Sequence, residues 1–158
     1  MANIVTFLSY RDRAEEAAKL YCSIFPSSRI TRTVPYPDIS PAPRPGAVMI
    51  VEVEMLGQRY ILMNGGEMFR FTESISLAVE CESQDEIDRY WAALTAGGGE
   101  PGPCGWLKDK FGMSWQVMPK NIGELVGSEP VRAKRVMEAV MTMGKLDIAT
   151  LKRAADGR

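Results

Sequence analysis

The order in which strand-like and helix-like segments follow one another constrains the fold of this chain most strongly. A strand, a helix and further strands are predicted between residues 4 and 64, and this order recurs between residues 74 and 118. A repeated order of elements indicates two structural modules of one kind. The sequence therefore predicts a single α+β domain of paired βαβββ modules. The first module is expected over residues 1–66, the second over 72–119, and a helical tail over 120–158.

Short runs of alternating apolar and polar residues define the strands of the first module. They are predicted at residues 4–8, 29–36, 48–55 and 59–64. Between the first two strands, apolar residues recur at helical spacing; Asp12 can cap this helix, and Pro26 ends it. Residues 37–46 carry four prolines and no apolar pattern, which predicts an exposed loop inside the module.

The second module repeats these signals. Its strands are predicted at residues 74–82, 104–108 and 113–118. Ser83, followed three residues later by Glu86, forms a capping box that opens a helix, and the glycines at 97–99 end it. Asp109 and Gly112 suit a hairpin turn between the last two strands.

The tail is predicted to be helical. Pro130 suits the first turn of a helix, Gly144 closes it, and Asp147 can cap a final helix. The apolar stripe of the longer helix consists of Val136, Met137, Val140 and Met141. These helices must bury their apolar stripes on the domain or on a partner subunit.

Composition excludes several classes of protein. The chain contains no histidine, so it has no Ser–His or Cys–His nucleophile pair and no metal site anchored by imidazole. Its formal net charge of −1 gives no support to nucleic-acid binding, which is typical of a basic surface. Three separated cysteines fit a reducing compartment. No apolar run approaches the roughly 18 residues that span a membrane, and no signal peptide is recognised, so a cytoplasmic protein is expected.

Four stretches of the chain match a family pattern. They are residues 21–26, 64–66, 104–116 and 141–149, of which CGWLKDKFGMSWQ is the most specific. In these stretches the chain resembles the PhnB-like proteins, often labelled 3-demethylubiquinone-9 3-methyltransferases. This group belongs to the vicinal-oxygen-chelate superfamily, which includes glyoxalase I, the fosfomycin- and bleomycin-resistance proteins and the extradiol dioxygenases.

The resemblance implies two half-open sheets whose concave faces enclose a pocket, with helices on the convex faces. A metal usually sits in such a pocket, held by His and Glu at one inward position on each of four strands. In this chain those positions fall on Thr6, on Asn64 or Leu62, on Ser74 and on Gln116. Neutral hydroxyls and amides are poor ligands for divalent metals, so neither a metal nor a cofactor is expected.

The resemblance and these residues together predict a metal-independent protein that binds an unknown small molecule in the concave pocket. The predicted ligand contacts are Thr6, Asn64, Ser74, Trp106 and Gln116. The amides of Asn64 and Gln116 could instead hydrogen-bond to each other or to backbone groups. The superfamily generally pairs its modules across a dimer, which implies a homodimer. Its interface is expected on the Met-rich tail, which carries Met137, Met141 and Met143.

The alternative is an enzyme, a lyase, isomerase or transferase that acts on a small metabolite. Glu52 or Glu80 would then transfer protons, although such strand carboxylates are more often solvated. Cys104 could be a nucleophile, or it could serve only in packing. Methyl transfer is disfavoured, because no strand leads through a glycine-rich turn into a helix that could meet a nucleotide-type cofactor. A scaffold with a collapsed pocket is a third possibility.

Overall fold

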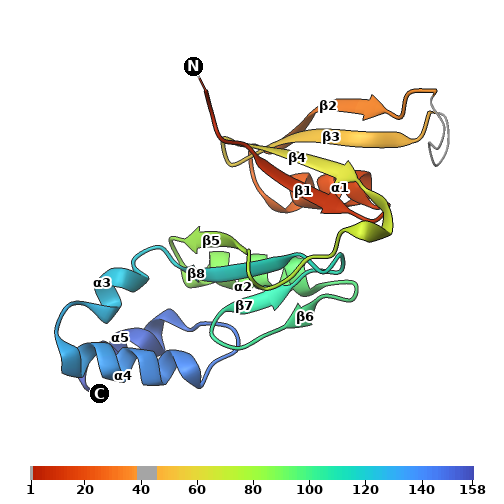
Figure 1. Ribbon diagram of the computed structural model, residues 1–158. Helices are drawn as coiled ribbons and strands as arrows, with labels where there is room; N and C mark the ends of the chain where they lie inside the picture. The colour runs from red at the N-terminus through yellow and green to blue at the C-terminus, as the bar shows by residue number, and fades with distance from the viewer. Residues whose placement is uncertain (1, 39–45) are drawn as a thin grey trace. The chain divides into compact units, whose positions relative to one another are not determined.

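The computed structural model describes residues 2–38 and 46–158 (Figure 1). Most of the proline-rich loop predicted at residues 37–46 lies outside the described residues. The chain forms two compact units, residues 1–71 and residues 72–158. Each unit is a layer of helix on sheet, and we describe each unit by itself.

The first unit contains one four-stranded sheet. Its elements are β1 (Thr6–Tyr10), α1 (Ala14–Ile24), β2 (Arg29–Pro35), β3 (Val48–Met55), β4 (Gln58–Asn64) and the short 3-10 helix η1 (Gly66–Met68). The strand order is β1-β4-β3-β2, with β1 parallel to β4 and the other pairs antiparallel. The predicted strands and helix of this module are therefore present, with bounds that differ by a few residues.

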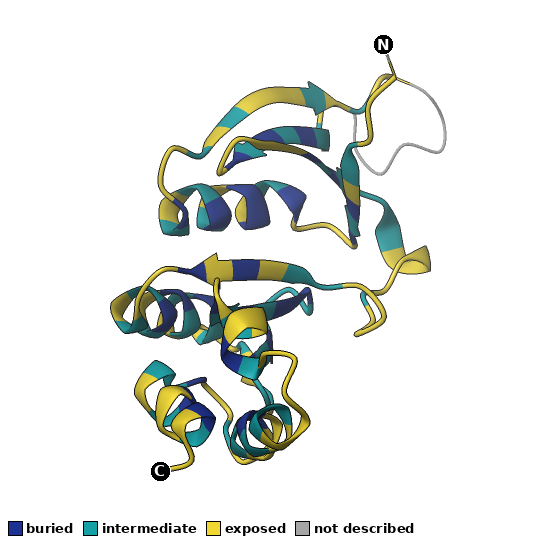
Figure 2. Cartoon of the chain, turned by 90° about the vertical axis from the view of Figure 1, so that its left-hand side faces the viewer, coloured by how far each residue is buried: buried dark blue, intermediate teal, exposed yellow. Residues whose placement is uncertain are grey.

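Helix α1 covers one face of this sheet, and the alternation of buried residues follows from that cover. Val51, Val53 and Leu62 are fully buried, as are Ala17 and Tyr21 of the helix. Their neighbours along the strands are only partly buried, because successive side chains of a strand point to opposite faces. Figure 2 shows buried and intermediate positions alternating in this way.

The second unit repeats the same topology. Its sheet elements are β5 (Leu77–Cys81), α2 (Gln84–Thr95), β6 (Glu100–Pro101), β7 (Trp106–Lys108) and β8 (Ser114–Pro119). The strand order is β5-β8-β7-β6, and β5 runs parallel to β8 as β1 does to β4. The predicted α+β fold with its repeated element order is thus confirmed. Strand β6 was not predicted, because two residues are too few to show a period.

Three helices follow the second sheet. They are α3 (Ile122–Val126), α4 (Pro130–Met141) and α5 (Ile148–Asp156). Their shared core consists of Leu125, Val136, Val140, Leu146, Leu151 and Ala155. The Asp147 carboxylate accepts a hydrogen bond from Thr150 N at 2.6 Å, so the predicted cap is confirmed. Met143 packs against the core, whereas Met137 and Met141 are exposed; the homodimer interface expected on these methionines stays a prediction.

Buried Asp109 organises the turn between β7 and β8. The side chain is 2% exposed, and its Oδ1 accepts hydrogen bonds from the backbone N–H groups of Phe111 (2.9 Å) and Met113 (3.1 Å). Its Oδ2 accepts a third, from Trp115 Nε1 at 2.9 Å. Gly112, with a φ of 85°, completes the predicted turn.

In the part of the chain that the structure describes, no helix is long and apolar enough to cross a membrane.

We expect Asp109→Ala to lower the free energy of unfolding by about 3 kcal/mol, because it leaves buried N–H donors without an acceptor. Urea denaturation measures this loss. Asp156→Asn, on an exposed residue at the end of α5, is the matched control and should change the midpoint little. Equal midpoints for the two variants would contradict this role of Asp109.

Candidate functional site

Asn64, the last residue of β4, links this strand to α1 and β3 of the first unit. Its Oδ1 accepts a hydrogen bond from Ala14 N at 2.8 Å, and its Nδ2 donates to Val48 O at 2.9 Å. The Asn64 carbonyl accepts a hydrogen bond from the Tyr36 hydroxyl. The amide therefore satisfies the first N–H of α1, the role predicted for Asp12. That prediction is wrong, because the residue at the N-cap is Arg13, and no side-chain cap comes from the helix's own flank.

Thr6 and Asn64 lie on the face of the sheet that α1 covers. Thr6 pairs with Tyr60 and Tyr10 pairs with Asn64, so all four share one face. The Tyr10 hydroxyl lies 3.0 Å from the hydroxyl of Tyr21 in α1, which identifies this face as the covered one. The resemblance implied the open, concave face for both residues, and this placement needs correction. The open-face positions of β1 are Phe7 and Ser9, one residue out of register with the prediction.

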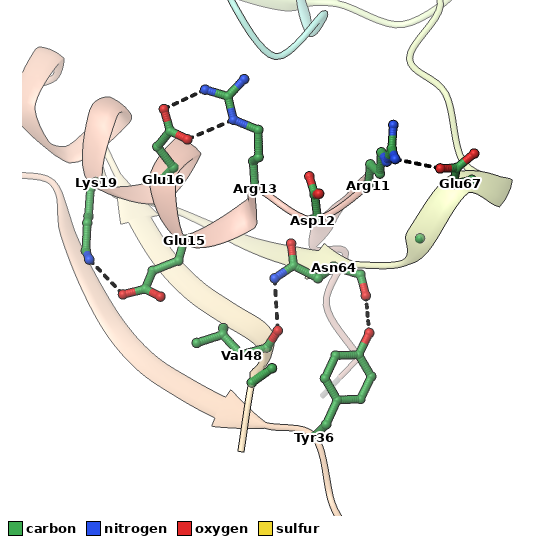
Figure 3. A pocket seen from close by; sticks show the side chains of 12 residues that line it. Arg11, Asp12, Arg13, Glu15, Glu16, Lys19, Tyr36, Val48, Asn64 and Glu67 are labelled. Atoms are coloured by element: carbon green, nitrogen blue, oxygen red, sulfur yellow. Dashed lines mark hydrogen bonds and ion pairs between the residues drawn. The ribbon is translucent and has the colours of Figure 1, made fainter. Parts of the chain in front are cut away.

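A pocket of about 730 Å³ lies beside Asn64 in this unit (Figure 3). It is lined by Arg11, Asp12, Arg13, Glu15, Glu16, Lys19, Tyr36, Ala47, Val48, Asn64, Gly66 and Glu67. Three ion pairs occupy its wall: Arg11–Glu67 (2.6 Å), Arg13–Glu16 (2.6 Å) and Lys19–Glu15 (2.7 Å). Asp12 has no partner among the described residues. The pairs are exposed and neutralise one another, so the pocket offers little net charge to a ligand.

The second unit brings two of the predicted contacts together. Trp106 of β7 and Gln116 of β8 are directly paired, and Gln116 also pairs with Ala78 of β5. These residues alternate with buried Leu107 and Trp115, which face α2. Trp106 and Gln116 therefore lie side by side on the face that α2 does not cover, which we name the open face of the second sheet.

Gln116 is held in place while keeping an acceptor free. Its Nε2 donates a hydrogen bond to Ser76 Oγ at 2.8 Å, and within residues 2–38 and 46–158 its amide oxygen has no partner. Ser74, the predicted contact, lies instead in an exposed turn before β5, where its N–H donates to Thr72 Oγ1 at 3.3 Å. The strand predicted to start at Ser74 starts at Leu77. The alternation within that predicted strand places Ser76 on the same face, so it is the serine that the sequence could have identified.

An ion pair borders this face. Lys108 lies two residues after Trp106 on β7, and its ammonium group hydrogen-bonds to the carboxylate of Glu73. This hydrogen bond lowers the pKa of Glu73 and raises the pKa of Lys108. Both groups therefore remain charged near neutral pH. They give the open face a polar border beside its aromatic centre.

The three residues considered for catalysis are ion-paired, exposed or packed against apolar side chains. Glu52 is ion-paired to Arg59 at 2.8 Å and to Arg32 at 3.8 Å, and Glu80 is exposed. Cys104 packs against the core of the C-terminal helices. These are the environments of structural groups, since an acid–base carboxyl or a nucleophilic thiol needs an activating neighbour.

Metal ligands are not gathered anywhere in the described parts of the chain. Among residues 2–38 and 46–158, no group of three or more His, Cys, Asp or Glu side chains is placed to hold an ion. Burial raises the pKa of the Cys81 thiol to about 11, so this sulfur stays protonated. On the open face, Gln116 offers an amide where a metal site needs a charged or imidazole ligand.

The fold compares closely with solved structures. The PhnB protein from Bacillus cereus is 32% identical with a TM-score of 0.65; the match covers 74% of this chain and 99% of that protein. Protein PA1353 from Pseudomonas aeruginosa is 19% identical with a TM-score of 0.63, covering 75% and 98%. The fosfomycin resistance protein FosX from Listeria monocytogenes, complexed with Mn(II) and sulfate, is 16% identical with a TM-score of 0.52, covering 75% and 89%. No curated protein matches the chain.

Two sheets of identical topology, each with one helix packed on one face, give the fold that the resemblance to the vicinal-oxygen-chelate superfamily implied. The model of the 3-demethylubiquinone-9 3-methyltransferase family matches residues 2–118. The chain therefore belongs to this PhnB-like family. Helices α3, α4 and α5 lie beyond the matched residues.

We expect Asn64→Ala to lower the free energy of unfolding by about 2 kcal/mol, because Ala14 N and Val48 O lose their partner. Denaturant titration followed by circular dichroism measures the loss. Asn64→Asp keeps the acceptor for Ala14 N and should recover part of it. An Asn64→Ala protein as stable as the wild type would contradict this linking role.

Proposed function

We propose that this protein binds a small molecule without a metal, and that the molecule lies on the open face of the second sheet. The observation that carries the proposal is the direct pairing of half-buried Trp106 with Gln116, whose amide oxygen is left without a partner in the described structure. Binding sites for small molecules combine an apolar surface with a few well-placed polar groups. This pair provides both.

The chemistry of the pair favours a ligand of mixed polarity. The indole ring of Trp106 offers a large, rigid apolar surface with one N–H donor. The oxygen of Gln116 can accept one hydrogen bond more, and the bond to Ser76 fixes its direction. The Lys108–Glu73 pair is already neutralised, so it does not select strongly for a charged ligand. A neutral or zwitterionic molecule with an apolar body fits these groups best.

Independence from metal is supported by the donor chemistry. The FosX structure contains Mn(II). This chain has no histidine, and the resemblance to the superfamily aligns Gln116 with a glutamate that binds the metal in other members. An amide and a hydroxyl hold a divalent cation weakly without carboxylates beside them.

An enzymatic role, including the methyl transfer that the family description suggests, has less support. Gly65 and Gly66 follow β4, but only the three-residue helix η1, which begins at Gly66, comes next. The glycines at 97–99 link α2 to the short strand β6. Neither turn aims the N-terminus of a long helix at a nucleotide-type cofactor.

A thermal-shift screen with small neutral and zwitterionic organic molecules tests the proposed site. We expect at least one compound to raise the Tm of the wild type by about 5 °C. Trp106→Ala and Gln116→Ala should lose most of this shift, since each removes a ligand contact. Asp12→Asn, in the pocket of the first unit, is the matched control and should keep the shift. A shift that Asp12→Asn loses and Trp106→Ala keeps would place the ligand in the first unit and contradict the proposal.

Elemental analysis of protein purified without chelator tests metal independence. Less than about 0.1 equivalent of any divalent transition metal per chain is expected, because neutral side chains at the open face bind such ions weakly. Treatment with a chelator should leave the ligand-induced Tm shift unchanged. A stoichiometric ion that the chelator removes together with ligand binding would show that metal independence is wrong.

A further inference from the structure

The turn before Trp106 has a strained backbone. Cys104 has a φ of 56° and Gly105 a φ of 84°, so two consecutive residues adopt the left-handed conformation. A hydrogen bond from Trp106 N to Pro103 O (2.9 Å) closes the turn, and Gly102 N donates to Trp106 O (2.8 Å). This is the tight turn that joins hairpin strands, but a non-glycine residue costs energy at its first central position. Such a turn persists only when its surroundings hold it.

The C-terminal segment holds this turn in place through hydrogen bonds. Cys104 N donates to Met143 O at 2.7 Å, and Gly105 N donates to Gly144 O at 2.7 Å. Both central residues of the turn thus donate their N–H groups to consecutive carbonyls of the loop between α4 and α5. Gly105 leaves no room for a side chain, since a Cβ there would lie 2.8 Å from Val117 O and 3.2 Å from Leu146.

The same segment borders the open face and is anchored to α2. Met118, two residues after Gln116 on the same face, packs against the C-terminal core, as does Cys104. Gln84 at the start of α2 donates to Leu146 O (3.1 Å) and accepts from Ile148 N (2.9 Å). These two hydrogen bonds of Gln84 therefore fix the loop whose carbonyls hold the turn.

We propose that the C-terminal helices are a positioning element for the ligand contact Trp106, acting through the strained turn at residues 102–105. This rests on the proposed function for the role of Trp106 as a contact. The family model matches residues 2–118, so the three C-terminal helices lie outside the residues that it covers. Release of the loop relaxes the left-handed turn and moves the start of β7, and with it the indole ring. Trp115, held by Asp109 on the other face, stays in place.

Fluorine NMR of the full chain labelled with fluorotryptophan tests the proposal, because each of the three tryptophans gives its own signal. In Gln84→Ala, we expect the Trp106 signal to shift or broaden while the Trp115 signal stays. The amide hydrogens of Cys104 and Gly105 should exchange roughly tenfold faster, as expected for the loss of one hydrogen bond's stabilisation. Lys152→Ala, on an exposed residue of α5, is the matched control and should change neither.

A rescue separates positioning from general destabilisation. Glycine adopts the left-handed conformation without cost, so Cys104→Gly in the Gln84→Ala background should return the Trp106 signal toward its native position. Faster exchange at Ile148 with an unmoved Trp106 signal would overturn the proposal.

Gly144→Ala provides a second perturbation if Gln84→Ala moves all tryptophan signals. Its methyl group would lie 3.3 Å from Gly102 O, against the turn itself. An unmoved Trp106 signal in this variant would also overturn the proposal. The measurement uses no ligand, so a Trp106 signal that follows the loop in a protein that binds no compound would overturn the proposed function alone.

Discussion

In each unit one helix packs on one face of the sheet, and the two-residue period of the strands determines whether a side chain points toward that helix or away from it. Residues on the covered face hold the fold, as Asn64 does when it joins α1 to β3. Residues on the open face are available to a ligand, as Trp106 and Gln116 are. The candidate site follows from this constraint, because the same residue type serves structure or binding according to its parity in the strand.

The fold was largely predictable from the sequence, because alternation and capping residues act locally. The capping box at Ser83 is present: Ser83 Oγ accepts from Glu86 N at 3.3 Å. The site was predictable only in part. A family resemblance aligns Thr6 and Asn64 within a residue or so, but an error of one residue changes the face. The hydrogen bond between Asn64 and Ala14 joins residues that are 50 positions apart, and a local sequence pattern cannot predict such a bond. The predicted placement of Ser74 on a strand is wrong, because the strand begins three residues later, at Leu77.

The two units use buried hydrogen bonds differently. In the first unit the Asn64 amide joins elements that are distant in sequence. In the second unit Asp109 organises a local turn, and its contact with Trp115 anchors the covered face. Trp106, one strand away, follows the turn at Cys104 and Gly105, whose N–H groups donate hydrogen bonds to carbonyls of the C-terminal loop. Trp115, which Asp109 holds, and the proposed ligand contact Trp106 therefore lie on neighbouring strands of one sheet.

Native mass spectrometry of gently purified protein tests the central claim most directly, namely that a small molecule is held at Trp106 and Gln116 without a metal. The account predicts a chain mass increased by one organic molecule with no metal ion, and loss of this molecule in the Trp106→Ala, Gln116→Ala double variant. A co-purified molecule that the double variant retains in full, or an added mass that belongs to a divalent ion, would contradict it.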